Sequence, residues 1–149
     1  MSLMYTSVFS KIKELFFVFA VGFFTYILVE LAWRSYSHLS MGLAGGFSLL
    51  CIYFLCCAFP QLNFIIKSLL SAVAITIIEL IFGLILNRFL GLSIWDYSTQ
   101  AFNLMGQICP LFSALWFFLC LPIIPLCKLL NRVFSSSTAI PAQSDKHAA

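Results

Sequence analysis

Charged side chains are scarce in this chain. Asp, Glu, Lys and Arg make up 9% of its 149 residues, 62% are hydrophobic, and the mean hydropathy is +1.06. Water-soluble domains carry about 25% charged residues, so this composition excludes that class and is typical of an integral membrane protein. The net charge of +3 is spread along the chain without a basic cluster, which excludes a nucleic-acid partner.

The residue patterns of catalysis and metal binding are also missing. Six cysteines lie in or beside apolar segments, with neither CxxC spacing nor a neighbouring His, so we expect small buried hydrophobes. His38 has no Ser-His-Asp order around it, and no GxxxxGK[ST] loop is present, so any use of ATP would require another chain. We expect no enzyme, no catalytic residue, no metal and no cofactor.

Four apolar segments are long enough to cross a bilayer. They cover residues 15–33, 43–59, 64–86 and 104–126, each near the ~20 residues that a hydrocarbon core of ~30 Å requires. Such a core offers no water to backbone groups, so the segments must be helical. The sequence predicts an all-α integral membrane protein with four transmembrane helices in residues 1–132, followed by a disordered polar tail, residues 133–149.

The basic residues indicate an orientation. With four crossings, both ends of the chain and the middle loop lie on one side of the membrane. Six basic residues fall on that side, against two on the other, which predicts cytoplasmic termini and two outward-facing loops. The six are Lys11, Lys13, Lys67, Lys128, Arg132 and Lys146; the two are Arg34 and Arg88.

Both outward loops have a similar plan. Trp33-Arg-Ser-Tyr-Ser37 follows the first span, and Trp95-Asp-Tyr-Ser98 precedes the fourth. We interpret the halves as two parallel two-helix pseudo-repeats related by an axis along the membrane normal. Trp33, Tyr36, Trp95 and Tyr97 have the positions of interfacial aromatic anchors, with ligand binding as the alternative.

Small and polar residues recur at helical spacing and predict the packing. Gly42 and Gly46 form a GxxxG pattern that allows another backbone to approach. Polar stripes on the first and third spans predict direct contact between these two spans. The stripe residues are Tyr26, Glu30, Thr76, Glu79 and Gly83.

Two carboxylates have alternative interpretations. Glu79 lies near the middle of an apolar span, where an ionised carboxylate costs about 2.5–3.5 kcal/mol. It is either a proton relay or cation contact, or a structural group bonded to Thr76, Tyr26 or Asn87. Glu30 precedes Arg34 by four residues, which favours an ion pair; alternatively, Glu30 and Glu79 share one outward site whose charge Arg34, Arg88 and Asp96 set.

Amides and prolines flank the fourth span. We expect Asn103 to be its N-cap, and Asn103 and Gln107 to turn toward Trp95 and Tyr97. Pro110, Pro122 and Pro125 are expected to kink or interrupt the helix.

Two long motifs resemble a known family. Glu30, Trp33-Arg34, Tyr36-Ser-His38, Ser40-Met41 and Gly45-Gly46, followed by Trp95-Asp-Tyr-Ser98, Phe102-Asn103 and Gly106-Gln-Ile-Cys109, resemble the Putative ABC-transporter type IV family of small bacterial membrane proteins, labelled permease-like. The resemblance covers roughly residues 15 to 130. Ser35 departs from the family's usual Gly, Leu39 from Trp, Ala101 from Pro and Pro110 from an apolar residue.

The resemblance implies a permease-like or transport-associated subunit in the bacterial inner membrane, with an outward-facing polar site and no named substrate. The expected partners are the lipid bilayer and either further copies of the chain or another membrane protein, including a separate ATPase. The alternative is a non-transporting structural or assembly protein that binds a partner protein or lipid headgroup. The candidate site residues are Glu30, Arg34, Glu79, Asp96, Asn103 and Gln107.

Overall fold

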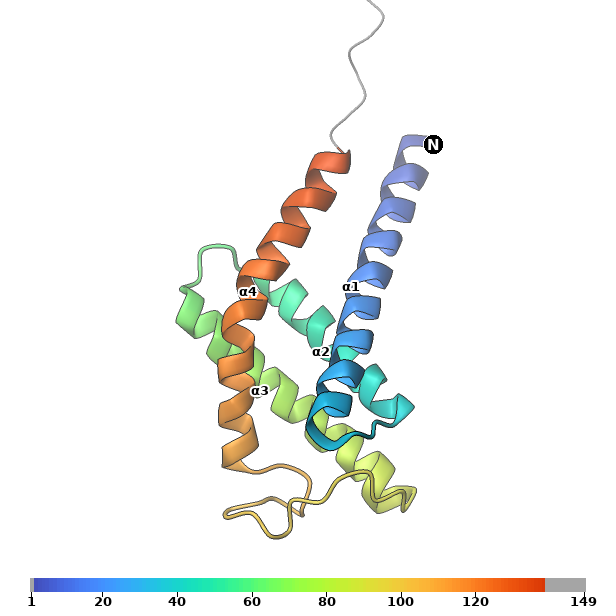
Figure 1. Ribbon diagram of the computed structural model, residues 1–149. Helices are drawn as coiled ribbons and strands as arrows, with labels where there is room; N and C mark the ends of the chain where they lie inside the picture. Colours follow the sequence, from blue (N-terminus) through green and yellow to red (C-terminus); the bar gives the residue numbers. More distant parts are fainter. Residues whose placement is uncertain (1, 139–149) are drawn as a thin grey trace, which may run out of the picture.

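The chain folds into four long helices. The computed structural model describes residues 2–138, and Figure 1 shows α1 (Ser2–Arg34), α2 (Leu39–Ala58), α3 (Phe64–Gly83) and α4 (Pro110–Thr138), with a short π-helix, η1 (Leu84–Phe89), continuing α3. The start of α1 and the end of α4 lie at one end of the bundle, and the loops after α1 and η1 at the other. The predicted all-α class with four helices long and apolar enough to span a membrane is confirmed.

The apolar spans differ in extent from the sequence prediction. They cover Val8–Arg34, Leu39–Ala58, Phe64–Phe89 and Pro110–Ser135. The fourth begins at Pro110 and not near residue 104, because Met105 and Gly106 have positive φ values of 56° and 71°, which no helix accommodates. Pro110 opens α4, where its missing N–H needs no partner.

The carboxyl end of α4 also lies beyond its predicted limit. The helix continues to Thr138, past the domain boundary drawn after residue 132, and it is uninterrupted at Pro122 and Pro125. The rest of the predicted tail, residues 139–149, lies outside the described residues.

The helices pack as two hairpins. Within them α1 lies mainly against α2 and α3 against α4, and α2 also contacts α3 and α4. No Cα atom of α1 lies within 8 Å of one in α3, so the predicted contact between the first and third spans is wrong. The reason is that α2 presents a small-residue face to α1. The twofold relation between the halves stays a prediction.

A glycine pair allows the closest approach between α1 and α2. A Cβ added to Gly22 would lie 2.6 Å from the carbonyl oxygen of Gly45, and one added to Gly45 would lie 2.7 Å from that of Gly22. Gly42 and Gly46, the predicted GxxxG pair, instead receive the rings of Phe23 and Phe19. Gly45, which lies between Gly42 and Gly46, therefore makes the backbone contact with α1.

Apolar side chains fill the centre of the bundle. Val18, Leu49, Ile52, Ile75 and Ile124 are each at most 6% exposed and belong to one cluster. Cys56, Cys120 and Cys127 are buried in the same cluster, as expected for small hydrophobes. Large apolar side chains on the outer faces of all four helices remain exposed and suit contact with lipid.

Replacing Gly45 with valine should separate α1 from α2. The added methyl groups meet the Gly22 carbonyl and the Tyr26 side chain, so we expect destabilisation of about 1–3 kcal/mol, the usual cost of overpacking. Thermal unfolding in detergent measures it. Cys51→Val, at an exposed position of the same helix, is the control. Equal melting temperatures for Gly45→Val and the unchanged chain would contradict the close approach.

Candidate functional site

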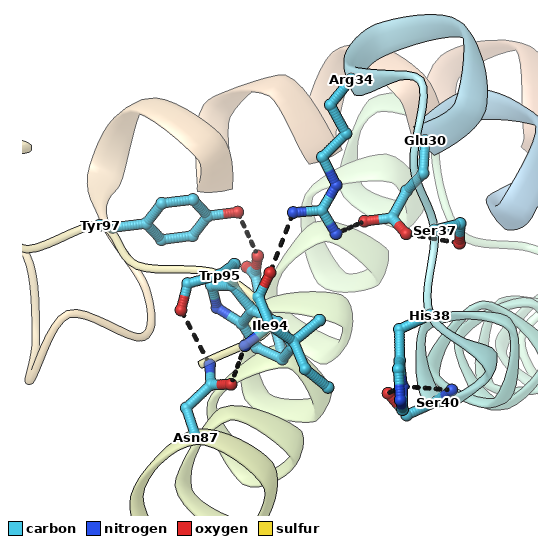
Figure 2. A network of polar contacts seen from close by, with 10 residues as sticks. Glu30, Arg34, Ser37, His38, Ser40, Asn87, Ile94, Trp95 and Tyr97 are labelled. Atoms are coloured by element: carbon cyan, nitrogen blue, oxygen red, sulfur yellow. Dashed lines mark hydrogen bonds and ion pairs between the residues drawn. The ribbon is translucent and has the colours of Figure 1, made fainter. Parts of the chain in front are cut away.

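Two loops meet at the end of the bundle opposite the start of α1: the first joins α1 to α2 (residues 35–38), and the second joins η1 to α4 (residues 90–109). Arg34, the last residue of α1, donates from Nη1 to the carbonyl oxygen of Ile94 at 3.1 Å. Figure 2 shows the Arg34 side chain reaching from its own helix toward the second loop. The segments that the sequence singled out, 30–41 and 95–109, are therefore adjacent in the structure.

Glu30 forms an ion pair with Arg34. Arg34 Nη2 lies 2.5 Å from Glu30 Oε1, and the Ser37 hydroxyl donates to Glu30 Oε2 at 2.7 Å (Figure 2). The favoured i, i+4 pairing is confirmed. Ser35, where the family usually has Gly, has φ of +53°, a left-handed conformation that glycine adopts with less strain.

Asn87 on η1 connects the second loop to the helices. Its Nδ2 donates to the carbonyl oxygen of Trp95 at 2.9 Å and to Gln107 Oε1 at 2.8 Å, while its Oδ1 accepts from the N–H of Ile94 at 2.7 Å (Figure 2). Gln107, 4% exposed, also donates to the Met105 carbonyl, and Trp95 Nε1 donates to the Gln107 carbonyl at 3.0 Å. The Gln107 amide thus bonds the loop backbone, as expected, but Gln107 contacts Trp95 through its own backbone carbonyl and not through the amide.

Asn103 stabilises the loop and not the helix. Its Nδ2 donates to the carbonyls of Ser98 and Gln100, and its Oδ1 accepts from the N–H of Gly106 at 2.9 Å. The prediction of an N-cap is wrong because α4 begins at Pro110, beyond its reach. Asn103 does satisfy loop backbone groups, as expected.

Asp96 accepts hydrogen bonds within its own turn. Its carboxylate accepts from the N–H of Ser98 at 2.8 Å and from the Ser98 hydroxyl. These hydrogen bonds, the hydroxyl's first, hold the pKa of Asp96 below its usual value. The side chain is exposed, and its contacts do not connect it with Glu79.

Glu79 is 6% exposed and is bonded by two aromatic side chains. Tyr97 of the loop donates its hydroxyl to Oε1 at 2.9 Å, and Trp116 of α4 donates Nε1 to Oε2 at 3.0 Å. Two of the three predicted partners bond elsewhere: Thr76 to the Ala72 carbonyl and Ser113, and Asn87 to the loop. The third, Tyr26, lines the same cavity as Glu79. Burial, and then the nearby Glu79 carboxylate, raise the pKa of Tyr97, so its phenol stays protonated.

A small cavity adjoins Glu79. Its volume is about 10 Å³, enough for roughly one water molecule. Its lining residues come from all four helices and the second loop: Tyr26, Met41, Ala44, Ser48, Ile75, Ile78, Glu79, Trp95 and Trp116. The site thus brings Glu79 together with groups that the sequence analysis left out, Ser48 and Trp116.

The predicted aromatic anchors divide into two pairs. Trp33 is 82% and Tyr36 58% exposed, which suits an interfacial position. Trp95 is buried, and Tyr97 is half-buried with its hydroxyl on Glu79, so the anchor prediction does not describe this second pair. Tyr97 also stacks on Phe112, with ring centroids 4.4 Å apart.

Sequence reasoning missed a second carboxylate, at the opposite end of the bundle. Glu14, 6% exposed, pairs with Lys11 at 2.7 Å and accepts a hydrogen bond from the buried hydroxyl of Tyr53. Tyr53 Oη also lies 3.4 Å from Asn131 Oδ1. Glu14 therefore joins α1 to α2 through Tyr53, which in turn lies next to Asn131 of α4. The i, i+3 spacing from Lys11 was the available signal in the sequence.

Asn87→Leu tests the central role of Asn87 in the loop. The substitution leaves the Ile94 N–H, the Trp95 carbonyl and Gln107 Oε1 without this partner, so we expect a loss of about 1–3 kcal/mol and faster hydrogen exchange in residues 90–109. Asn63→Ala, which removes the cap of α3 at the other end, is the control and should leave exchange in that loop unchanged. Unaltered exchange in Asn87→Leu would refute this role.

Comparison with known proteins identifies the family. No curated protein and no solved structure matches the chain. The model of the family described as "Putative ABC-transporter type IV" matches residues 17–144. This range includes both loops and every residue that lines the cavity beside Glu79. Because the match covers most of the chain, this four-helix membrane protein belongs to the Putative ABC-transporter type IV family.

Proposed function

We propose that this protein is a permease-like, transport-associated subunit of the bacterial inner membrane, and that its ligand site is the outward-facing region around Glu79. The single observation that carries the proposal is the carboxyl group of Glu79, 6% exposed inside an apolar span, with no basic side chain within 4.0 Å among the described residues. Ionisable groups inside a membrane are expensive and mark proton, ion or substrate sites. Membership of a transporter family supports the same role.

The loop at residues 90–109 controls access to the site. Tyr97 holds Glu79 from the loop side, and Asn87 and Arg34 hold the backbone next to Tyr97. Because the cavity admits about one water molecule, a larger ligand reaches Glu79 only after this loop moves. The hydrogen bond from Arg34 to the Ile94 carbonyl places the Glu30–Arg34 ion pair beside this loop.

Other chains complete the proposed transporter. A cavity of this size provides no substrate path through a single copy, and the sequence has no loop of the GxxxxGK[ST] type for ATP. Self-association or another membrane protein would supply the path, and a separate ATPase the energy. The apolar outer faces of α1 and α4 are available for such packing within the bilayer.

A structural or assembly protein is the second candidate. Both carboxyl oxygens of Glu79 already accept hydrogen bonds, so the group also suits a purely structural connection between α3, α4 and the loop. In that case the outward loops bind a partner protein or a lipid headgroup, and Glu79 takes no part.

The proposed orientation has a direct test. We expect a green fluorescent protein fused after residue 149 to fluoresce, because the bias of basic residues places the carboxyl terminus in the cytoplasm. Alkaline phosphatase fused after Thr99 of a truncated chain should be active, because that loop then faces outward. Activity of alkaline phosphatase fused after residue 149 would reverse the orientation.

Substitutions of Glu79 separate the two candidate functions. Melting temperatures of the unchanged chain, Glu79→Gln and Glu79→Leu are compared from about pH 5 to 9. For a ligand or proton site, only the unchanged chain varies with pH through this carboxyl group, while Tyr26, Tyr97 and the Glu30–Arg34 pair are present in all three. Glu79→Leu loses about 1–3 kcal/mol on either candidate, because Tyr97 and Trp116 lose their acceptor.

The Gln variant decides the outcome. Glu79→Gln keeps the shape of the side chain and an oxygen acceptor, so it should fold. Superimposable pH curves for the unchanged chain and Glu79→Gln would refute the ligand-site function and favour the structural one.

A further inference from the structure

The cavity beside Glu79 has the size of one small polar species. At about 10 Å³ it matches a water molecule, and an ammonium ion is of similar size. Residues of all four helices and of the 90–109 loop line it, so it lies between these elements of the fold. The occupant is therefore small, or is the small end of a larger molecule.

The electrostatics of the cavity favour a cation. Among the described residues Glu79 has no basic side chain within 4.0 Å, and the Arg34 side chain at this end of the bundle already has other partners. Arg34 Nη2 is paired with Glu30 at 2.5 Å, and Arg34 Nη1 donates a hydrogen bond to the Ile94 carbonyl. A carboxylate without a counter-ion in an apolar environment has to take up a proton or a cation.

Two further oxygen atoms at the cavity are unused. The hydroxyls of Ser48, 7% exposed, and Tyr26 make no hydrogen bond to any described residue, although both side chains line the cavity. Serines in helices commonly bond to the carbonyl four residues earlier, as Ser68 does here to Phe64, but Ser48 does not. A hydroxyl oxygen that accepts no hydrogen bond from the protein keeps its acceptor lone pairs, so both oxygens can accept hydrogen bonds from an occupant of the cavity.

Aromatic rings form much of the remaining wall. Tyr26 and Trp116 lie with ring centroids 5.9 Å apart, and Trp95 completes the aromatic lining. Aromatic faces attract cations, by up to about 2 kcal/mol in desolvated sites, and thereby replace lost hydration. Divalent metal ions instead take about six or more oxygen ligands, which a carboxylate and two hydroxyls do not supply.

These observations together define the occupant. We propose that the cavity binds an ammonium group, either the free ion or the head of a small primary amine, with its N–H groups on Glu79, Ser48 and Tyr26 and its charge against the rings of Trp95 and Trp116. The inference rests on the proposed function of this region as a ligand site and names the ligand class. The free ion fits the cavity as it stands, whereas an alkylamine requires the 90–109 loop to shift.

Thermal unfolding of the full chain in lipid nanodiscs tests the proposal. Ammonium chloride, methylammonium chloride and tetramethylammonium chloride are titrated at neutral pH, with sodium and potassium chloride at equal ionic strength as references. We expect ammonium to raise the melting temperature saturably, by about 3–6 °C at roughly ten times Kd. Tetramethylammonium has no N–H group and should have no effect, and methylammonium distinguishes an amine head from the free ion.

Variants assign the effect to the cavity. Glu79→Gln should abolish the shift, whereas Glu14→Gln, which alters the other buried, tyrosine-bonded carboxylate, should retain it. Ser48→Ala and Tyr26→Phe each remove one acceptor and should weaken ammonium binding about fivefold. These two variants still test the proposal if Glu79→Gln does not fold.

Three results would overturn the proposal: no difference between ammonium and the sodium or potassium references, a shift that persists in Glu79→Gln, or unchanged affinity in both Ser48→Ala and Tyr26→Phe. If ammonium has no effect while the Glu79-dependent pH response remains, the ligand class is wrong and the ligand site stands. If the pH response is also missing, the proposed function itself fails.

Discussion

The hydrogen-bonding requirement of one carboxyl group organises the end of the bundle at which the 90–109 loop lies. Glu79 is 6% exposed within an apolar span, so its oxygens need donors from the protein. Those donors are Tyr97 and Trp116, which come from a loop and from the next helix. The loop therefore has to fold back over the bundle, and its position in turn depends on the hydrogen bonds of Asn87.

The close crossing of α1 and α2 gives this site its other wall. Because Gly22 and Gly45 bring the two backbones together, Tyr26 and Ser48 both reach the cavity while α1 and α3 remain apart. The apolar cluster around Ile52 and Ile124 then separates the Glu79 region from the Glu14–Tyr53 pair at the other end. The bundle thus holds one buried carboxylate near each end with an apolar barrier between them.

Local patterns in the sequence predicted what depends on local interactions. Hydropathy and length were sufficient for the four helices, and i, i+4 spacing for the Glu30–Arg34 pair. The partners of Glu79 are 18 and 37 residues away in the chain, so periodicity carried no information about them. The neighbour of α1 was predicted wrongly because small residues occur on several helix faces, and only tertiary packing selects among them. The start of α4 was missed because residues 104 and 105 are apolar yet form part of a turn.

The loop that covers Glu79 contains unfavourable backbone conformations. Ser93, Phe102 and Met105 all have positive φ, which costs a non-glycine residue about 1–2 kcal/mol. Phe102 is 91% exposed, so packing of its side chain does not offset this cost. In the loop opening proposed above, relaxation of these residues to ordinary conformations would offset part of the hydrogen bonds that are lost. The closed and open forms would then differ less in free energy than the contacts alone suggest, and a ligand of modest differential affinity would suffice to shift the balance between them.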